Sequence, residues 1–211
     1  MQEGFGDAPE EPDSPADCVT INTQTGQLEV SILHNDWRQD DWHDGLEALV
    51  DFIAQLTDKA LSLILADKSL SIDNWRKNAL HSEWSLQLSD NQAIQILNQD
   101  WRHQNKPTNV LSFPAQSEEE IEMILLSLDA EKPDKAPPVL LGDVVLARET
   151  LIAEAQAAGK PVRHHFAHLI VHGFLHLWGY DHQQPDQADR MEALEIKVLN
   201  FFDVPSPYEE A

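Results

Sequence analysis

The alternation of apolar and other residues predicts strands in the first two thirds of the chain. Residues 28–34 (LEVSILH) place leucine, valine and isoleucine at alternate positions, and residues 84–88 (WSLQL) do the same with tryptophan and leucine. This period of two is typical of a strand with one buried face. Residues 106–114 (KPTNVLSFP) combine a turn-like Pro-Thr-Asn with a short apolar strand that Pro114 closes. Residues 139–147 (VLLGDVVLA) are apolar enough for an interior strand.

Apolar residues three and four positions apart predict helices over much of the remaining chain. These helices cover residues 42–66, 149–159, 162–177 and 187–202, with a short one in residues 121–128. A further helix begins after Ser89, since Gln92 three residues later completes a capping-box signal. Its apolar face consists of Ile94, Leu97 and Trp101. Strands come early and helices late in the chain, which favours an α+β fold.

The length of 211 residues suits one domain with appendages. We expect residues 1–26 to form a flexible acidic tail, because they are poor in apolar residues and rich in Pro, Asp and Glu. Residues 27–204 are predicted to form the domain, with insertions near residues 37–80 and 115–137. Residues 205–211 are interpreted as a C-terminal tail.

Several features predict a cytoplasmic protein without a membrane partner. No apolar run approaches the roughly 18 residues that a membrane-spanning helix needs. The first residues are acidic and proline-rich, unlike the basic and apolar parts of a signal peptide. Cys18 is the single cysteine, so an intramolecular disulfide is impossible and a reducing compartment fits.

The net charge of −23 argues against a nucleic-acid partner when it is taken alone. However, residues 101–117 and 155–180 contain no Asp or Glu. The basic residues in these two segments are Arg102, Lys106, Lys160 and Arg163. Two interpretations stay open: a local cationic surface on an acidic protein, or two mostly apolar segments that simply carry few charges.

Residues 172–182 (HGFLHLWGYDH) predict a metal site. His172 and His176 are four residues apart and therefore lie on one face of a helix. Gly179 can adopt a left-handed conformation that ends the helix, so that His182 returns as a third ligand. Three neutral imidazoles suit zinc and leave a fourth position for water, as in catalytic zinc sites. The alternative is a set of histidines that only pack and form hydrogen bonds.

Other residues near this segment are candidates for the surroundings of the metal. His168 lies one turn before His172 and could support a ligand, although a core or surface histidine with ordinary partners is the alternative. Asp181 could orient an imidazole through a carboxylate–histidine bond, or it could cap the turn. His164 and His165 are weaker candidates.

Gly173 occupies the position where zinc proteases with the H-E-x-x-H motif have a glutamate base. That base transfers a proton to the leaving amine, which peptide hydrolysis requires. A phosphodiester instead passes through an anionic transition state, which zinc and an arginine can stabilise. The glycine therefore favours a phosphoester over a peptide substrate.

HGFLHLWGYDH, KPTNVLSFP and LGDVVLA together resemble the YbeY family, metal-dependent endoribonucleases of rRNA maturation in bacteria and organelles. The family pattern joins the histidine block to an upstream N-x-x-x-R-x-x-x-K-P-T-N/D-V-L-S-F-P segment, and a G-D-[IV]-x-[IL] strand lies between them. Here the upstream segment supplies Asn98, Arg102 and Lys106. The likeness continues in the last helix through Met191, Glu192 and Glu195.

The resemblance implies a small mixed sheet surrounded by helices, with one zinc ion on His172, His176 and His182. It further implies that Arg102 faces the metal and holds the scissile phosphate, as a guanidinium can through two parallel hydrogen bonds. We therefore take Arg102 and His172 as catalytic candidates and Lys106 as a second substrate-binding residue. A solvated helix residue is the alternative for Arg102.

The predicted function is a zinc-dependent endoribonuclease that cleaves single-stranded RNA in rRNA processing, 16S rRNA 3′-end maturation and ribosome quality control. Its expected partners are an rRNA precursor and the ribosome or a ribosomal protein, without DNA. Water or the RNA 2′-hydroxyl could be the nucleophile. Two alternatives stay open: a metzincin-like metalloprotease, suggested by the histidine spacing, and a non-catalytic ribosome-assembly factor with structural zinc. Three histidines also bind nickel or copper.

Overall fold

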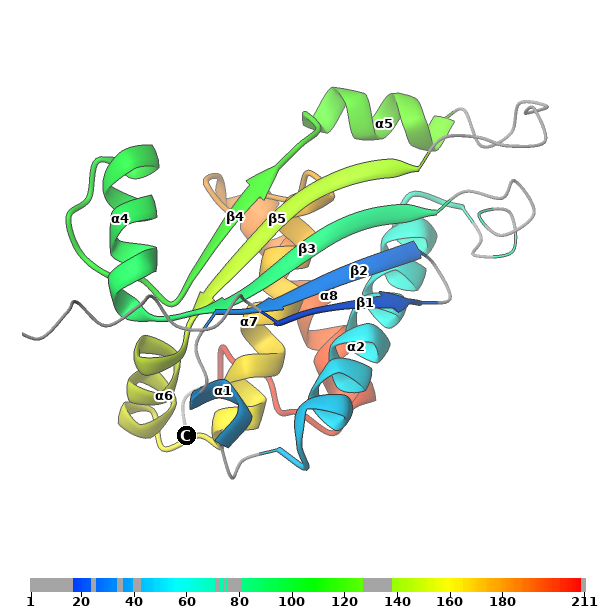
Figure 1. Ribbon diagram of the computed structural model, residues 1–211. Helices are drawn as coiled ribbons and strands as arrows, with labels where there is room; N and C mark the ends of the chain where they lie inside the picture. The colour runs from blue at the N-terminus through cyan, green and yellow to red at the C-terminus, as the bar shows by residue number, and fades with distance from the viewer. Residues whose placement is uncertain are drawn as a thin grey trace, which may run out of the picture.

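A computed structural model of the chain describes residues 17–23, 26–33, 36–39, 43–70, 73, 75, 81–126 and 138–209. These residues form one five-stranded sheet with helices packed around it (Figure 1). The strands are β1 (Asp17–Asn22), β2 (Gly26–Ile32), β3 (Ser82–Ser89), β4 (Val110–Pro114) and β5 (Val139–Ala147). The helices are α1 (Asp36–Gln39), α2 (Leu46–Asp67), α4 (Asn91–Arg102), α5 (Glu118–Leu126), α6 (Arg148–Ala157), α7 (Val162–Leu177) and α8 (Pro185–Phe201). The predicted α+β fold is confirmed.

The sheet is mixed, with the strand order β1-β2-β3-β5-β4. Strands β2, β3 and β5 are parallel, whereas β1 and β4 pair antiparallel at the two edges. The predicted alternation sets the register, because Leu28 pairs with Trp84 and Val30 pairs with Leu86. All four of these side chains are buried on one face of the sheet. Strand β5 has a neighbour on each side, so its prediction as an interior strand is confirmed.

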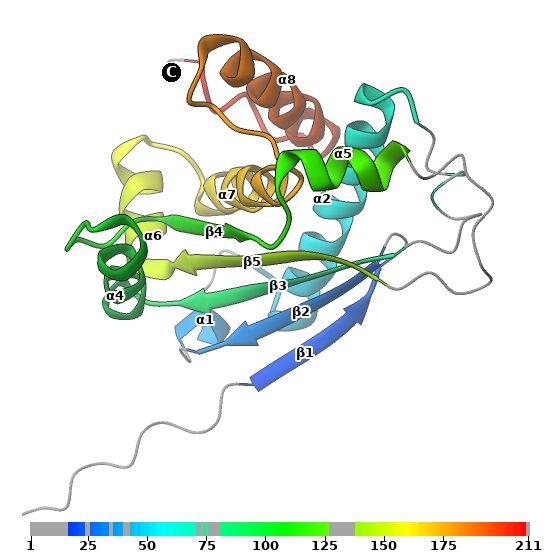
Figure 2. The same cartoon turned by 90° about the horizontal axis from the view of Figure 1, so that it is seen from above.

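The two faces of the sheet pack against different helices. Val144 and Leu146 of β5 belong to the main core, together with buried residues of α2, α7 and α8. Val145 and Ala147 point to the other face, where they form a small cluster with Ile94 of α4. In Figure 2, α7 and α8 accordingly lie on the far side of β4 and β5 from α4. The histidine-bearing helix α7 is therefore a core element on one face, and α4 lies on the opposite face.

The cap of α4 differs from the predicted capping box of Ser89 and Gln92. Ser89 is the last residue of β3. Asp90 is the N-cap: its backbone is extended and its side chain accepts a hydrogen bond of 2.8 Å from the backbone N–H of Ala93. Aspartate is as good an N-cap as serine, and the strand holds Ser89 in its ladder. The prediction was therefore wrong by one residue.

Part of the predicted acidic tail forms strand β1. Val19, Thr20 and Ile21 are β-branched residues, which favour strands, and all three pair with β2. Residues 1–16 lie outside the described residues. Helix α2 falls in the region predicted as an insertion, yet most of its inward face is in the main core, including Ile53, Leu56 and Leu61.

The second predicted insertion, residues 115–137, contains α5, whereas residues 127–137 lie outside the described part of the chain. Residues 205–209, predicted as a tail, run back beside α7, where Lys160 Nζ donates a hydrogen bond of 2.8 Å to the carbonyl of Pro207. Among the described residues, no helix has both the length and the apolar character to cross a bilayer.

Candidate metal centre

Helix α7 and the turn that follows it bring three histidines together. His172 and His176 are one turn apart on α7, and their Nε2 atoms are 3.1 Å apart. Gly179 has a φ of +80°, a left-handed conformation that costs glycine little and other residues more. The chain reverses there, and His182 joins the pair so that one ligand atom from each residue lies within 4.8 Å of the others. The predicted three-histidine group is present.

The hydrogen bonds of the Nδ1 atoms of His172 and His176 determine which nitrogen of each imidazole is free. The Nδ1 atom of His172 lies 2.9 Å from Oε1 of Glu195, and the Nδ1 atom of His176 lies 2.9 Å from the carbonyl oxygen of Tyr180. A carboxylate and a carbonyl can only accept, so each Nδ1 carries the proton. When both rings are neutral, the two Nε2 atoms present lone pairs to each other, an arrangement that repels unless a cation lies between them.

The ionisation states of the buried groups agree with this assignment. Burial, together with the charges that His172 and His182 can carry, lowers the pKa of His176 to about 4. The ring is therefore neutral at pH 7, which is the form that binds metals. Burial alone would raise the pKa of Glu195, but hydrogen bonds from His168 and His172 lower it to about 2. The carboxylate is consequently ionised and accepts both bonds.

The donor set fits zinc. At a Zn–N bond length of about 2.05 Å, tetrahedral geometry places two ligand nitrogens about 3.3 Å apart, close to the observed 3.1 Å between the Nε2 atoms. The carboxylate–histidine contact of Glu195 is the usual support of a metal-bound imidazole. His168, His172 and Glu195 form a second possible ligand group, but there the nitrogens and carboxylate oxygens face each other at hydrogen-bond distance.

The two neighbouring candidates have clear partners. The Nε2 atom of His168 lies 3.1 Å from Oε2 of Glu195, so His168 contacts the carboxylate that supports His172. Asp181 accepts a hydrogen bond of 2.8 Å from the backbone N–H of His182, which is the turn-capping role. His165 instead bonds to Glu154 over 2.8 Å.

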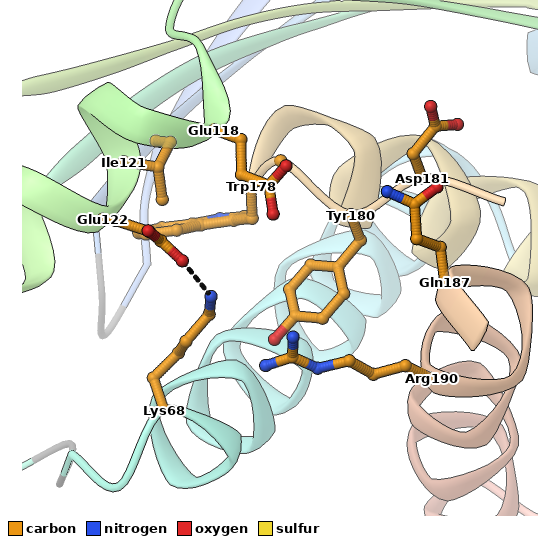
Figure 3. Close-up of a pocket in the computed structure, with 10 residues that line it drawn as sticks. Lys68, Glu118, Ile121, Glu122, Trp178, Tyr180, Asp181, Gln187 and Arg190 are labelled. Carbon is orange, nitrogen blue, oxygen red and sulfur yellow. Dashed lines mark hydrogen bonds and ion pairs between the residues drawn. The ribbon is translucent and has the colours of Figure 1, made fainter. Parts of the chain in front are cut away.

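A polar cluster beside the metal group holds the turn that carries His182 (Figure 3). The hydroxyl of Tyr180 donates to Oδ2 of Asp67 over 2.8 Å, and the guanidinium of Arg190 reaches the same oxygen over 2.6 Å. On the other side of this pocket, Lys68 and Glu122 form an ion pair of 3.2 Å that joins α5 to the end of α2. Tyr180 therefore attaches the turn to the end of α2, and Arg190 of α8 bonds to the same carboxylate.

Comparison with known proteins places this site in a family. A profile described as Endoribonuclease YbeY matches residues 47–203. The chain belongs to the YbeY endoribonuclease family. An Endoribonuclease YbeY from Sinorhizobium medicae is 39% identical over 86% of this chain and 94% of its own length. One from Azorhizobium caulinodans is 46% identical over 60% of this chain and 71% of its own length. A solution structure from Thermotoga maritima covers 76% of this chain and 93% of its own, with a TM-score of 0.41 at 19% identity.

Gly173 in the family motif has a packing role that the sequence does not reveal. A Cβ atom at this position would lie 2.9 Å from Cγ1 of Val144 and 3.3 Å from Oγ of Ser112. The position therefore faces the sheet at close range, and a glutamate there would have no room. Our interpretation of this glycine as a sign of phosphoester chemistry needs correction, since the close approach of α7 to β4 and β5 requires it whatever bond is cleaved.

The structure does not bring Arg102 and Lys106 into contact with the histidines. Arg102 ends α4 and is exposed, and among the described residues its side chain has no hydrogen-bond or ion-pair partner. Asn98, buried in α4, donates a hydrogen bond of 2.7 Å to the carbonyl of Lys106 and so fixes the loop after the helix. Thus, the YbeY motif residues of α4 organise this loop, while the positions of Arg102 and Lys106 relative to RNA remain a proposal.

Sequence reasoning missed the roles of Glu195 and Tyr208. Glu195 is completely buried and lies with Met191 and Val198 on the apolar face of α8. An acidic residue at such a position was the available signal, because carboxylates are rarely buried without partners. Tyr208 donates a hydrogen bond from its hydroxyl to Oε2 of Glu195. No sequence pattern indicated this role of Tyr208, since the residue follows the last helix and lies beyond the YbeY match.

We predict that Gly173→Ala destabilises the protein. Overpacking against the stiff Val144 costs about 1–3 kcal/mol, and the better helix propensity of alanine returns about 1 kcal/mol. Urea unfolding should therefore show a net loss of up to about 2 kcal/mol. In the double variant with Val144→Ala the removed methyl groups make space, so the two losses should be less than additive. Additive losses, or a stabilised Gly173→Ala, would contradict the proposed contact.

We also predict that the purified chain binds one zinc ion and that His176→Ala loses it. His164→Ala is the matched control, because His164 lies on the same helix but outside the three-histidine group. Zinc content after reconstitution and dialysis, measured by mass spectrometry, should fall from about one ion per chain to almost none in His176→Ala only. Equal loss in the control would show that the histidines bind metal nonspecifically.

Proposed function

We propose that this chain is a zinc-dependent endoribonuclease that cleaves single-stranded RNA during rRNA processing. Membership of the YbeY endoribonuclease family supports the cleavage of RNA. The observation that carries the zinc part is the distance of 3.1 Å between the Nε2 atoms of His172 and His176, while both Nδ1 atoms face acceptors. We further propose 16S rRNA 3′-end maturation and ribosome quality control as its role, with the ribosome or a ribosomal protein as partner. The single cysteine fits the cytoplasm as the compartment.

In the proposed reaction, one set of residues binds the metal and another binds the phosphates of the RNA. His172, His176 and His182 would hold the zinc ion. Zinc on three neutral imidazoles supplies Lewis-acid catalysis and lowers the pKa of a bound water. Arg102 would bind the scissile phosphate and Lys106 a neighbouring one. A guanidinium without an intramolecular partner is available for this contact, and its planar fork matches two phosphate oxygens.

The position of α4 supports a flexible substrate. Arg102 lies on the helix that packs on one sheet face, and His172 and His176 lie on the helix that packs on the other. For one scissile phosphate to contact both Arg102 and the metal, the RNA must cross the sheet edge at β4, which is the edge strand on this side of the sheet. Single-stranded RNA can follow such a path, because its backbone bends and its bases separate easily. A stiff duplex would fit this path poorly.

A groove next to Arg102 supports binding of unpaired bases. It measures about 700 Å³ and is lined by residues of the open sheet face and of α4, including Trp101, Phe113 and Gln87. Trp101 is 70% exposed, and its ring lies edge-on to Phe113 at 5.7 Å between centroids. Exposed aromatic rings bind single-stranded nucleic acid by stacking on bases.

One observation favours a second candidate, a ribosome-assembly factor in which the metal is structural. The side chain of Arg102 makes no contact with the histidine group among the described residues, so a phosphate clamp is not built into the fold. In that case the loss of Arg102 would leave the function of the protein unchanged. No comparable observation favours a metalloprotease, because Gly173 faces the sheet and cannot be replaced by a glutamate base.

We predict that Arg102→Ala abolishes RNA cleavage while zinc stays bound. Loss of one group that stabilises transition-state charge costs about 10²- to 10³-fold in rate, and the histidines do not depend on Arg102. The measurement is cleavage of a 5′-labelled single-stranded RNA by zinc-loaded wild type, Arg102→Ala, Arg102→Lys and the exposed-charge control Lys197→Ala. Arg102→Lys should retain intermediate activity, because an ammonium keeps the charge but not the fork.

The same assay separates the two candidates and identifies the nucleophile. Equal activity of wild type and Arg102→Ala would contradict the role of the arginine, and zinc-loaded wild type without activity would favour the assembly factor. Products that end in a 2′,3′-cyclic phosphate indicate attack by the 2′-hydroxyl. Products with 5′-phosphate and 3′-hydroxyl ends indicate attack by water.

A further inference from the structure

The carboxylate of Glu195 links the metal centre to the C-terminal segment of the chain. Glu195 has no exposed surface, and its two oxygens contact three donors. Oε1 accepts from His172, and Oε2 accepts from both His168 and the hydroxyl of Tyr208. A buried carboxylate needs such partners, because leaving one lone pair unmatched in the interior is costly.

The backbone carries Tyr208 to this position by reversing after α8. Asp203 has a φ of +57°, and Val204, which follows it, is buried. The segment of residues 204–209 then runs beside α7, where Lys160 holds the carbonyl of Pro207. The ring of Tyr208 meets the ring of His168 edge-on, with 5.7 Å between centroids. The segment is thus attached at both Lys160 and Glu195.

We propose that Tyr208 is a positioning residue of the metal centre, which acts by fixing the carboxylate of Glu195 that orients His172. This inference rests on the proposed metal site, but not on RNA as its substrate. Without the hydroxyl of Tyr208, His168 is the one remaining donor to Oε2 among the described residues, and the carboxylate can rotate about its side chain. The direction in which His172 presents Nε2 then becomes less defined.

The contribution of Tyr208 comes from outside the part of the chain that the family profile matches. The match ends at residue 203, so residues 204–209 add a support that the histidine motif does not contain. The expectation that residues 205–211 form a tail is therefore replaced, for residues 205–209, by a structural role at the site. Tyr208 and Glu209 are both exposed, but of the two it is Tyr208 whose hydroxyl reaches Glu195, which makes Glu209 a control in the same segment.

The test compares zinc and cobalt binding of the full-length chain in wild type, Tyr208→Phe, Glu195→Gln and Glu209→Gln. Tyr208→Phe keeps the ring that packs on His168 and removes only the donor. Zinc affinity, measured by competition with a chromophoric chelator, should fall about 3- to 10-fold in Tyr208→Phe and about 10- to 100-fold in Glu195→Gln. Glu209→Gln should bind like wild type. The visible absorption of the Co²⁺ form should change in Tyr208→Phe, because its ligand geometry is altered.

The outcomes distinguish this inference from the proposed function. Wild-type affinity and an unchanged Co²⁺ spectrum in Tyr208→Phe would overturn the positioning role, and so would two zinc ions per chain, since Glu195 would then be a ligand. Unfolding of the metal-free proteins tests whether Tyr208 has a merely structural role. If Glu209→Gln lost as much zinc affinity and as much metal-free stability as Tyr208→Phe, the positioning role would also be overturned. Wild type that binds zinc but cleaves no RNA would contradict the endoribonuclease proposal alone, because the affinity differences would persist.

Discussion

The close approach of α7 to strands β4 and β5 is the constraint on which the metal centre depends. Gly173 permits it, since a Cβ atom there would lie 2.9 Å from a methyl group of Val144. Protein interiors are packed tightly enough that one methyl group in such a place displaces its neighbours. The approach fixes both the distance and the rotation of α7 relative to the sheet. On this helix, His172 contacts Glu195 of α8, and His176 contacts the carbonyl of Tyr180 in the turn before His182.

The second determinant is a carboxylate buried between α7 and α8. Desolvation of an ionised Glu195 costs several kcal/mol, and the hydrogen bonds from His168, His172 and Tyr208 offset this cost. Apolar residues of similar size would hold the helices together as well, but they would not define the proton position on His172. The buried charge therefore stabilises one tautomer of a candidate ligand more than it stabilises the fold.

The parts of this structure that could be predicted from sequence are those governed by local periodicity. The alternation in residues 28–32 and 84–88 indicated the two strands, and the spacing of His172, His176 and His182 with Gly179 indicated the metal group. The rest depends on contacts between distant residues. Nothing local reveals that Val144 crowds Gly173, that β1 completes the sheet edge, or that Tyr208 returns to Glu195. The prediction of the α4 cap failed for a different reason. Ser89 and Asp90 are both good N-cap residues, but Ser89 pairs as the last residue of β3, so Asp90 is the N-cap.

The structure also decides how the few cations of the two acid-free segments are used. Lys160 is engaged by the carbonyl of Pro207, and the guanidinium of Arg163 lies 4.3 Å from the centre of the Phe52 ring. Arg102 and Lys106 are exposed: Arg102 is the last residue of α4, and Lys106 lies in the connection between α4 and β4. A broad basic face is therefore absent from these segments, and the net charge of −23 repels RNA at long range. Under the proposed function, RNA affinity would arise from a few phosphate contacts near α4, from stacking on Trp101 and from the candidate metal centre, which would favour short single-stranded segments over extended RNA surfaces.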